Sequence, residues 1–189
     1  MSLTNPTLAQ RALGGRFGEL PVQIGLAIAG SILLAISAQF KVAIGPVPFT
    51  LQTLVLLILA ASYGRNLAVA TVVLYLVEGA VGLPVFTNGG GFGHLVGPTA
   101  GFLLGFIPLA AIVGEAADRG LDRSPLTLAP AMLIGEVVLF AMGFAWLSTV
   151  IGADKAFAAA VAPFIVPDLI KIAVAALAVP AGWALLGRK

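Results

Sequence analysis

The chain has 189 residues, of which 60% are hydrophobic and only 10% are charged, and its mean hydropathy is +1.09. A soluble domain is about 25% charged, so the chain has too few charges to cover a surface that faces water. Its net charge of +2 comes from scattered basic residues, unlike the stripe typical of a nucleic-acid-binding surface. Cysteine is absent and His94 is the single histidine, which argues against disulfides and against a thiolate or multi-histidine metal site. We therefore predict an all-α integral membrane protein with a single domain, residues 1–189, and without a metal or cofactor.

Charges and Gly/Pro clusters divide the chain into six apolar stretches. They cover residues 22–40, 42–63, 67–83, 95–113, 126–151 and 156–186. A straight membrane-spanning helix needs about 20 residues, so the last stretch is too long for one simple helix. We expect six transmembrane helices, because a helix satisfies its own backbone in lipid and the alternating pattern of an outer-membrane barrel is missing.

The basic residues predict the orientation of the bundle. If residues 1–20 form a cytoplasmic arm before a bundle of residues 21–187, the outer loops carry only Lys41 and Lys155. The inner segments carry seven basic residues, Arg11, Arg16, Arg65, Arg119, Arg123, Arg188 and Lys189. This bias predicts cytoplasmic N and C termini. The membrane is expected to be a bacterial cell (inner) membrane. A cleaved signal peptide is the alternative for the first stretch, because two arginines precede its apolar core and residues 35–37 are small-x-small.

Outer loops are predicted near residues 41–48, 83–97 and 152–166. In the first of them Pro46 and Pro48 stand two residues apart, which breaks a helix, so the regular helix is expected to begin near Pro48. Irregular backbone at membrane depth is tolerated where it is buried in protein or lines a cavity. The alternative is a tight outer turn between two tilted helices.

The glycine-rich segment 83–97 is the second break. Asn88, Phe86 and Phe92 could close a pocket there, although Asn88 and Gly89 also suit a plain turn. Three glycines that follow at every fourth residue, Gly97, Gly101 and Gly105, predict a smooth face where another helix approaches closely.

An acid and an amine lie in the last apolar stretch. Asp168 and Lys171 are three residues apart and so share one helix face. Each costs roughly 2.5–3.5 kcal/mol at the centre of a membrane helix unless it is paired or solvated. Counted outward from Arg188, they lie toward the outer end of the span, with Pro167 in the first helical turn and residues 156–167 as an outer loop or bent entry. They predict a substrate site beside the broken backbone, and a purely structural pair near the interface is the alternative.

Several other polar side chains fall within the apolar stretches. Gln52, Thr50 and Tyr75 could offer hydrogen bonds toward a ligand, or could be satisfied by neighbouring helices. Glu78, at the outer end of the third stretch, is a candidate for the site or for the interface. Glu115 is expected at the inner interface, and Glu136 is expected to face the bundle.

Four segments resemble the BioY family, the biotin-specific substrate-binding (S) components of energy-coupling factor (ECF) transporters. They are GPVPFTLQ (45–52), GLPVF (82–86), LVGPTAGF (95–102) and PDLIK (167–171). The resemblance implies a six-helix S-component fold, a biotin site near the outer face and polar contacts from Asp168 and Lys171. It also implies that the first helix meets a coupling protein through small residues, which Ala27, Ser31 and Ala35 fit loosely.

The chain has no G-x-x-x-x-G-K-[ST] motif, so the energy for transport must come from elsewhere. The resemblance implies one transmembrane coupling subunit and two ABC-type ATPase subunits as partners, with partner-independent biotin transport as the alternative. A proton-coupled secondary carrier that uses Glu136 or Asp168 as a relay is a further alternative. An enzyme is not expected, because the chain lacks cysteine, a second histidine and a G-x-S-x-G motif.

Overall fold

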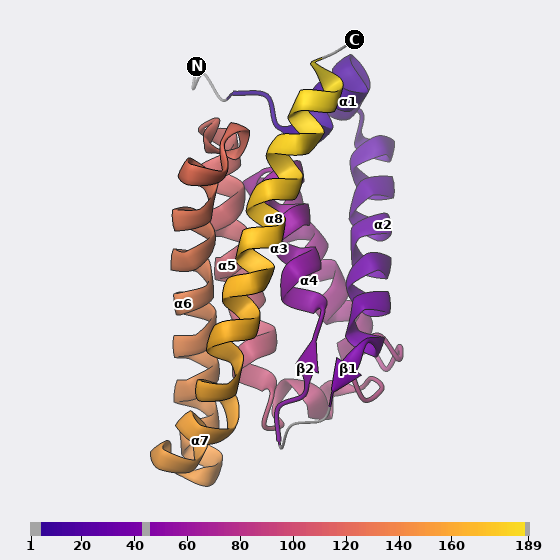
Figure 1. The fold of residues 1–189 in the computed structure, drawn as a ribbon. Coiled ribbons are helices and arrows are strands. Elements are labelled where there is room, and N and C mark those ends of the chain that lie inside the picture. The colour runs from indigo at the N-terminus through magenta and orange to yellow at the C-terminus, as the bar shows by residue number, and fades with distance from the viewer. Residues whose placement is uncertain (1–4, 43–45, 188–189) are drawn as a thin grey trace.

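The computed structural model describes residues 5–42 and 46–187, which form a bundle of helices (Figure 1). The helices are α1 (Leu8–Leu13), α2 (Leu20–Gln39), α3 (Gln52–Tyr63), α4 (Arg65–Ala80), α5 (Ala100–Asp118), α6 (Pro125–Ile151), α7 (Ala153–Ala160) and α8 (Ile165–Leu186). Short 3-10 turns are η1 (Gly14–Gly18), η2 (Phe92–Leu95), η3 (Leu121–Arg123) and η4 (Ala162–Phe164). Strands β1 (Lys41–Val42) and β2 (Phe49–Thr50) pair antiparallel, with Lys41 opposite Thr50.

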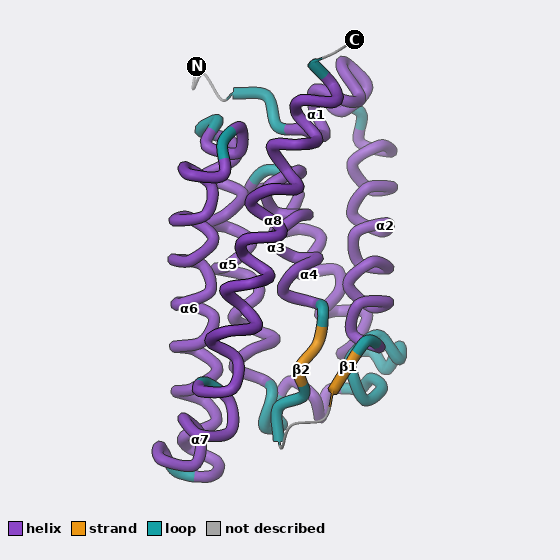
Figure 2. The backbone as a smooth tube through the Cα atoms, viewed as in Figure 1, coloured by secondary structure: helices purple, strands orange, loops and turns teal. Residues whose placement is uncertain are grey.

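Helix α5 lies at the centre of the packing, where it contacts α3, α4 and α6, and α8 closes the bundle against α3 and α6. Figure 2 shows the two short strands at the end of the bundle opposite α1, beside the loops that join α2 to α3 and α4 to α5. The core is built from aliphatic side chains of α3, α4, α5 and α6, with the fully buried ring of Tyr75 among them.

Within residues 5–42 and 46–187, four segments are long and apolar enough to cross a membrane: Leu20–Gln39, Ala100–Asp118, Pro125–Ile151 and Ala153–Leu186. The last of these is divided into α7, η4 and α8 by a break at Val161, so α8 alone supplies the straight part of the span. Helix α3 is apolar but only 12 residues long, and α4 has 16 residues. The multi-pass membrane protein expected from the composition is therefore confirmed at the level of these four segments.

The predicted stretch 126–151 matches α6 within one residue, because Ser124 caps the helix and Gly152 ends it. The other boundaries differ more. The helix expected from near Pro48 begins at Gln52, and the preceding residues form β2, so the Pro-rich break contains a strand pair that was not predicted. The helix expected at residue 95 begins at Ala100, and residues 153–160, expected as part of an outer loop, form α7.

The glycine stripe packs as predicted. A Cβ atom added to Gly101 would lie 2.5 Å from the backbone oxygen of Met142 and from the Cβ of Trp146, and one added to Gly105 would lie 2.8 Å from Leu139. The indole of Trp146 also donates a 2.8 Å hydrogen bond to the carbonyl of Gly97. The small residues of α5 therefore let α6 approach closely at the level of the cavity described below.

The arm at residues 5–19 is folded onto the end of the bundle where α8 also ends. Thr7 caps α1, its hydroxyl accepting from the backbone of Gln10, whose side chain accepts from the backbone of Thr7. The backbone of Asn5 donates to the carbonyl of Asp118 at the end of α5. Arg188 and Lys189, which contributed to the predicted charge bias, lie outside the described residues.

Candidate functional site

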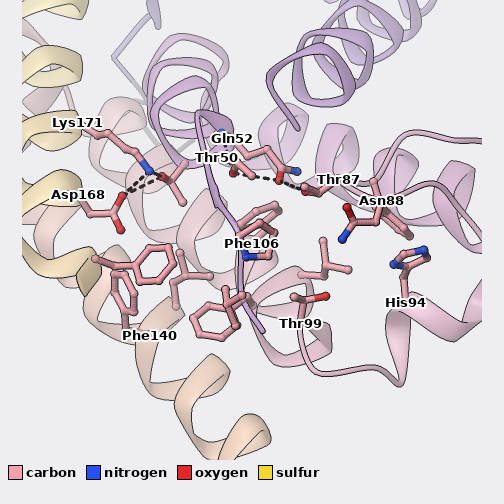
Figure 3. Close-up of a pocket in the computed structure, with 18 residues that line it drawn as sticks. Thr50, Gln52, Thr87, Asn88, His94, Thr99, Phe106, Phe140, Asp168 and Lys171 are labelled. Carbon is pink, nitrogen blue, oxygen red and sulfur yellow. Dashed lines mark hydrogen bonds and ion pairs between the residues drawn. The ribbon is translucent and has the colours of Figure 1, made fainter. Parts of the chain in front are cut away.

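A cavity lies near the strand pair, between the first turns of α3 and α8, the N-terminal half of α5 and the glycine-rich loop (Figure 3). Its empty space, including the open mouth, is about 710 Å³. Its apolar lining consists of Val47, Pro48, Phe86, Phe102, Leu103, Phe106, Leu139, Phe140 and Phe164. Its polar lining consists of Thr50, Gln52, Thr53, Thr87, Asn88, His94, Thr99, Asp168 and Lys171.

One end of the cavity holds the acid–amine pair. The ammonium of Lys171 lies 2.6 Å from Oδ1 of Asp168 and donates to the hydroxyl of Thr53 at 2.8 Å. That hydroxyl in turn donates to Asp168 at 3.2 Å. The side chains of the pair are only 7% and 5% exposed. Because Pro167 and Asp168 fall in the first turn of α8, the carboxylate also lies at the positive end of the helix dipole, which stabilises its charge.

An aromatic ring covers the amine. The Lys171 ammonium lies 4.1 Å from the centroid of the Phe49 ring, close enough for a cation–π interaction. The strand pair therefore contributes directly to the charged end of the cavity, since Phe49 belongs to β2 and packs on Phe164 before α8.

The middle of the cavity carries an uncharged hydrogen-bond network around Gln52. Its amide nitrogen donates to the hydroxyl of Tyr75 at 2.7 Å, and its oxygen accepts from Thr50 at 3.2 Å and from Thr87 at 3.3 Å. Tyr75 then donates to the carbonyl of Val85 at 3.0 Å. The network joins α3 and α4 to the glycine-rich loop, so the loop is held against the helices that form the cavity.

A lysine ties the two outer segments together at the mouth of the cavity. Lys41, in β1, donates to Oδ1 of Asn88 at 2.8 Å and also to the backbone carbonyl of Thr87. In Figure 3 Asn88 and His94 lie at the end of the site away from Asp168 and Lys171. The cavity thus has one end that holds the Asp168–Lys171 pair and another lined by Asn88 and His94, with aromatic walls between them.

Most of the predicted substrate-binding residues line this cavity. Asp168, Lys171, Asn88, Gln52, Thr50 and Phe86 do so, and Phe102 does so as well. Tyr75 does not line the cavity and is fully buried behind Gln52, which makes it a support for the site. The geometry therefore brings together side chains from segments more than 100 residues apart.

Two predicted residues lie elsewhere. Phe92 is 66% exposed in η2 and does not line the cavity, because the turn directs it away from the bundle. Glu78 accepts a hydrogen bond from Ser31 and lines a separate shallow groove between α2 and the start of the glycine-rich loop. In this structure neither side chain lines the cavity, and their contact with a ligand stays a prediction.

The expected partner surface on α2 differs in exposure from one residue to the next. Ser31 is fully buried, and its hydroxyl donates to the carbonyl of Ile28 and to Glu78. Ala27 and Ala35 are half-buried. The small residues that α2 exposes are Gly25 and Ala29.

Sequence reasoning missed several lining residues, among them Thr53, Thr87, His94 and Thr99. Thr53 directly follows Gln52, and its position in the first turn of the same helix is the one signal that could have identified it. The others are isolated polar residues in or beside irregular segments, where no periodicity shows which way a side chain points.

The cavity is polar at both ends and aromatic between them, and it lies in a helical bundle embedded in lipid. These features define a membrane protein that binds a small amphipathic molecule. The fold agrees with this class. A solved structure described as the S-component for biotin from an ECF-type ABC transporter superposes with a TM-score of 0.73, covering 84% of this chain and 89% of that one at 20% identity.

The BioY family model matches residues 13–188, so the chain belongs to the BioY family. A probable biotin transporter BioY from Pyrococcus horikoshii is 37% identical over 146 residues, 77% of this chain and 86% of the relative. A biotin transporter BioY from Rhizobium etli is 37% identical over 175 residues, 85% of this chain and 93% of the relative.

Proposed function

We propose that this chain is the biotin-binding membrane component of a vitamin uptake transporter, located in the bacterial cell membrane. One observation carries the proposal: an acid–amine pair and a neutral polar cluster stand at opposite ends of one aromatic-walled cavity. The relatives named as biotin transporters support the choice of biotin among small amphipathic molecules.

The chemistry of biotin fits this lining. Biotin has an apolar thiophane ring and valeryl chain, a ureido group with two N–H donors and one carbonyl acceptor, and a carboxylate. Asp168 accepts from a ureido N–H, while Lys171 donates to the ureido carbonyl or pairs with the carboxylate. Asn88, Gln52 and Thr50 supply the uncharged contacts, and Phe86 and Phe102 pack on the bicycle.

Six membrane crossings are proposed for α2, α3, α4, α5, α6 and α8, with α1 and the end of α8 on the cytoplasmic side. The short α3 crosses together with β2 before it, because Val47 and Thr50 are buried and irregular backbone at membrane depth is tolerated where it lines a cavity. Among the described residues this places five arginines inside and Lys41 and Lys155 outside, in keeping with the positive-inside rule. The cavity then opens toward the outer face.

Energy is proposed to come from an ECF complex with one transmembrane coupling subunit and two ATPase subunits. The contact on this chain is assigned to α2, whose exposed face carries Gly25 and Ala29 beside the half-buried Ala27 and Ala35. Uptake of labelled biotin by cells with and without these subunits tests the assignment. Uptake that persists without them, and that Gly25→Leu leaves unchanged, contradicts it.

Ligand identity is tested by thermal stability. The purified protein is heated with biotin and, separately, with several other vitamins, and the melting temperature is followed for each. A ligand that binds only the folded protein stabilises it by about 2.7 kcal/mol at 100 times its dissociation constant, so a clear upward shift is expected with biotin alone. An equal or larger shift with another vitamin, or no shift with biotin, contradicts the proposed substrate.

A further inference from the structure

Glu136 is an ionisable group inside the bundle that the proposed binding chemistry does not use. It lies in α6 and is 2% exposed. Among the described residues no group donates a hydrogen bond to either of its carboxyl oxygens, and both oxygens are buried. Asp168 and Lys171, by contrast, satisfy each other and Thr53.

Glu136 is close to the cavity without lining it. Leu139 and Phe140, one helical turn further along α6, form part of the cavity wall. Gly135, its neighbour on the inner side, packs on Leu109 of α5. Figure 1 shows α6 running from the end of the bundle near α1 to the end near α7. Glu136 precedes Leu139 and Phe140 by three and four residues, so it lies about one helical turn nearer to the α1 end than these cavity-lining residues.

The main elements packed against α6 are α5, α7, α8 and η3. The acidic groups of α5 lie in its last turn, the charged pair Asp154–Lys155 of α7 lies at the opposite end, and η3 carries Asp122 and Arg123 beside the start of α6. Helix α8 brings Asp168 and Lys171 to the same cavity that Leu139 of α6 lines, so a negative charge at Glu136 is opposed by Asp168 and favoured by Lys171.

These observations favour the protonated form of the carboxyl group. Among the described residues, Lys171 is the one lysine or arginine that lines the cavity, and it already lies 2.6 Å from Asp168. An anion at Glu136 would give this buried cluster a net negative charge with no donor to stabilise it, and such a charge is very costly away from water. With a proton on Glu136 the cluster is neutral.

A biotin carboxylate adds one negative charge to the same region. When Glu136 is protonated, the biotin carboxylate meets a cluster with no net charge. When Glu136 is ionised, the carboxylate meets a cluster with a net negative charge. We propose that Glu136 is a proton-binding site whose occupation is required for high-affinity binding of biotin, which makes biotin binding proton-linked. This inference rests on the proposed function, because it assumes that the anionic vitamin occupies the cavity.

The test is the dissociation constant of labelled biotin, measured on the purified full-length protein from about pH 6 to about pH 9. In the wild type the constant is expected to rise about tenfold per pH unit once Glu136 loses its proton, because only the protonated fraction binds. Glu136→Gln keeps the shape and neutrality of the protonated acid, so its constant is expected to match the wild-type value at low pH and to stay constant. The variant retains Asp168, Lys171 and His94, so any pH dependence of biotin binding that comes from these groups remains in the variant.

Calorimetry in buffers of different ionisation enthalpy gives a second measurement. The wild type is expected to take up close to one proton per bound biotin at the alkaline end, and Glu136→Gln close to none. Glu136→Leu serves as a further neutral variant if the amide does not fold. Glu115→Gln, at the far end of α5 beside Arg65 and Arg119, is the matched control and is expected to keep the wild-type profile.

The outcomes separate the two proposals. If biotin does not bind the wild type at any pH, the proposed function fails. If biotin binds with the same affinity across the range, or if Glu136→Gln keeps the wild-type pH dependence, the proposed function stands and the role of Glu136 is overturned.

Discussion

Lys41 donates a 2.8 Å hydrogen bond to Asn88, which joins residues that are 47 positions apart in the chain. The same ammonium bonds the carbonyl of Thr87, whose side chain lines the cavity. Lys41 is also paired with Thr50 through the strands, so one residue connects both outer segments that border the cavity mouth. Because these contacts are made at an exposed rim, they can break and re-form without disturbing the core.

We expect Lys41→Met to speed the release of biotin. The substitution keeps the aliphatic stem and removes the donor, so the two segments separate more easily. A loss of about 1 kcal/mol corresponds to a roughly fivefold faster dissociation rate. The measurement is the dissociation of labelled biotin after dilution, with Lys155→Met, the same change at the outer lysine of α7, as control. Equal rates in wild type and Lys41→Met would show that the contact does not retain the ligand.

The Asp168–Lys171 pair gives a prediction about stability that differs from the one about binding. Removing one partner leaves the other charge buried and unpaired, so Asp168→Asn and Lys171→Met are each expected to destabilise the fold by about 3–5 kcal/mol. Replacing both by apolar residues, as Asp168→Leu with Lys171→Met, removes both buried charges and is expected to restore most of that loss. The melting temperature of all variants in one detergent measures the change in stability. A biotin-binding assay on the same samples measures the change in affinity.

Binding is expected to be lost in all three variants, including the stable double variant. A double variant that is stable and still binds biotin would remove the pair from the site. The variant Glu115→Gln, which breaks ion pairs on the surface of the bundle, is the control and is expected to change neither quantity appreciably.

The sequence predicts helices well where a single signal decides the structure. The 27 residues of α6 are an uninterrupted apolar run between a serine cap and a glycine, so local signals alone define both ends. The first break was expected from Pro46 and Pro48, but β1 and β2 were not, because a strand pair depends on backbone groups across a loop. Helix α7 was expected as part of a loop because Gly152 and Pro163 flank it, whereas its four alanines after Lys155 favour a helix.

The site, like the fold, contains residues that the sequence could predict and residues that it could not. Asp168 and Lys171 could be predicted because two charges in an apolar stretch are costly and their spacing of three places them on one face. Thr87 and His94 reach the cavity through the path of an irregular loop, which no periodicity describes. Phe92, two residues before His94, has the same kind of sequence context and points away, so composition alone could not separate them.

Gly79 allows the aromatic wall of the cavity to form. A Cβ atom at this position of α4 would overlap the ring of Phe86, which packs edge-on against Tyr75 with centroids 5.4 Å apart. We expect Gly79→Ala to displace the Phe86 ring, to lower stability by about 1–3 kcal/mol and to weaken biotin binding. Equilibrium binding and melting temperature of the variant test this.

Gly25→Ala is the matched control, because Gly25 lies in α2 with no heavy atom of the described residues within 4 Å of an added Cβ. That change is expected to leave binding intact and to stabilise the helix by up to about 1 kcal/mol. Adding Phe86→Leu to Gly79→Ala makes room for the new methyl group and is expected to recover stability without recovering affinity. Unimpaired binding by Gly79→Ala would show that the Phe86 ring is not needed in its observed position.

The inner end of α8 is held by Asp122, which is fully buried in η3 and accepts a 2.6 Å hydrogen bond from the indole of Trp183. Burial raises the pKa of the Asp122 carboxyl above its ordinary value, and the bond from Trp183 and the charge of Arg123 offset only part of this. The folded protein therefore holds this proton more tightly than the unfolded chain. Asp122 favours folding most at low pH, and this contribution is lost as the pH rises through its folded-state pKa.

Asp122→Asn removes the titration but keeps an oxygen that accepts from Trp183. The melting temperature of the wild type minus that of Asp122→Asn is expected to fall as the pH rises from about 4 to about 7. Other titrating groups are present in both proteins and cancel in the difference. Trp183→Phe, made in a chain that keeps Asp122, removes the donor. It is expected to lower the free energy of unfolding by about 1–3 kcal/mol, because it leaves a buried carboxyl without its partner. If Asp122→Asn and the wild type instead respond to pH in parallel, the carboxyl exchanges its proton equally in both states, and burial has not raised its pKa.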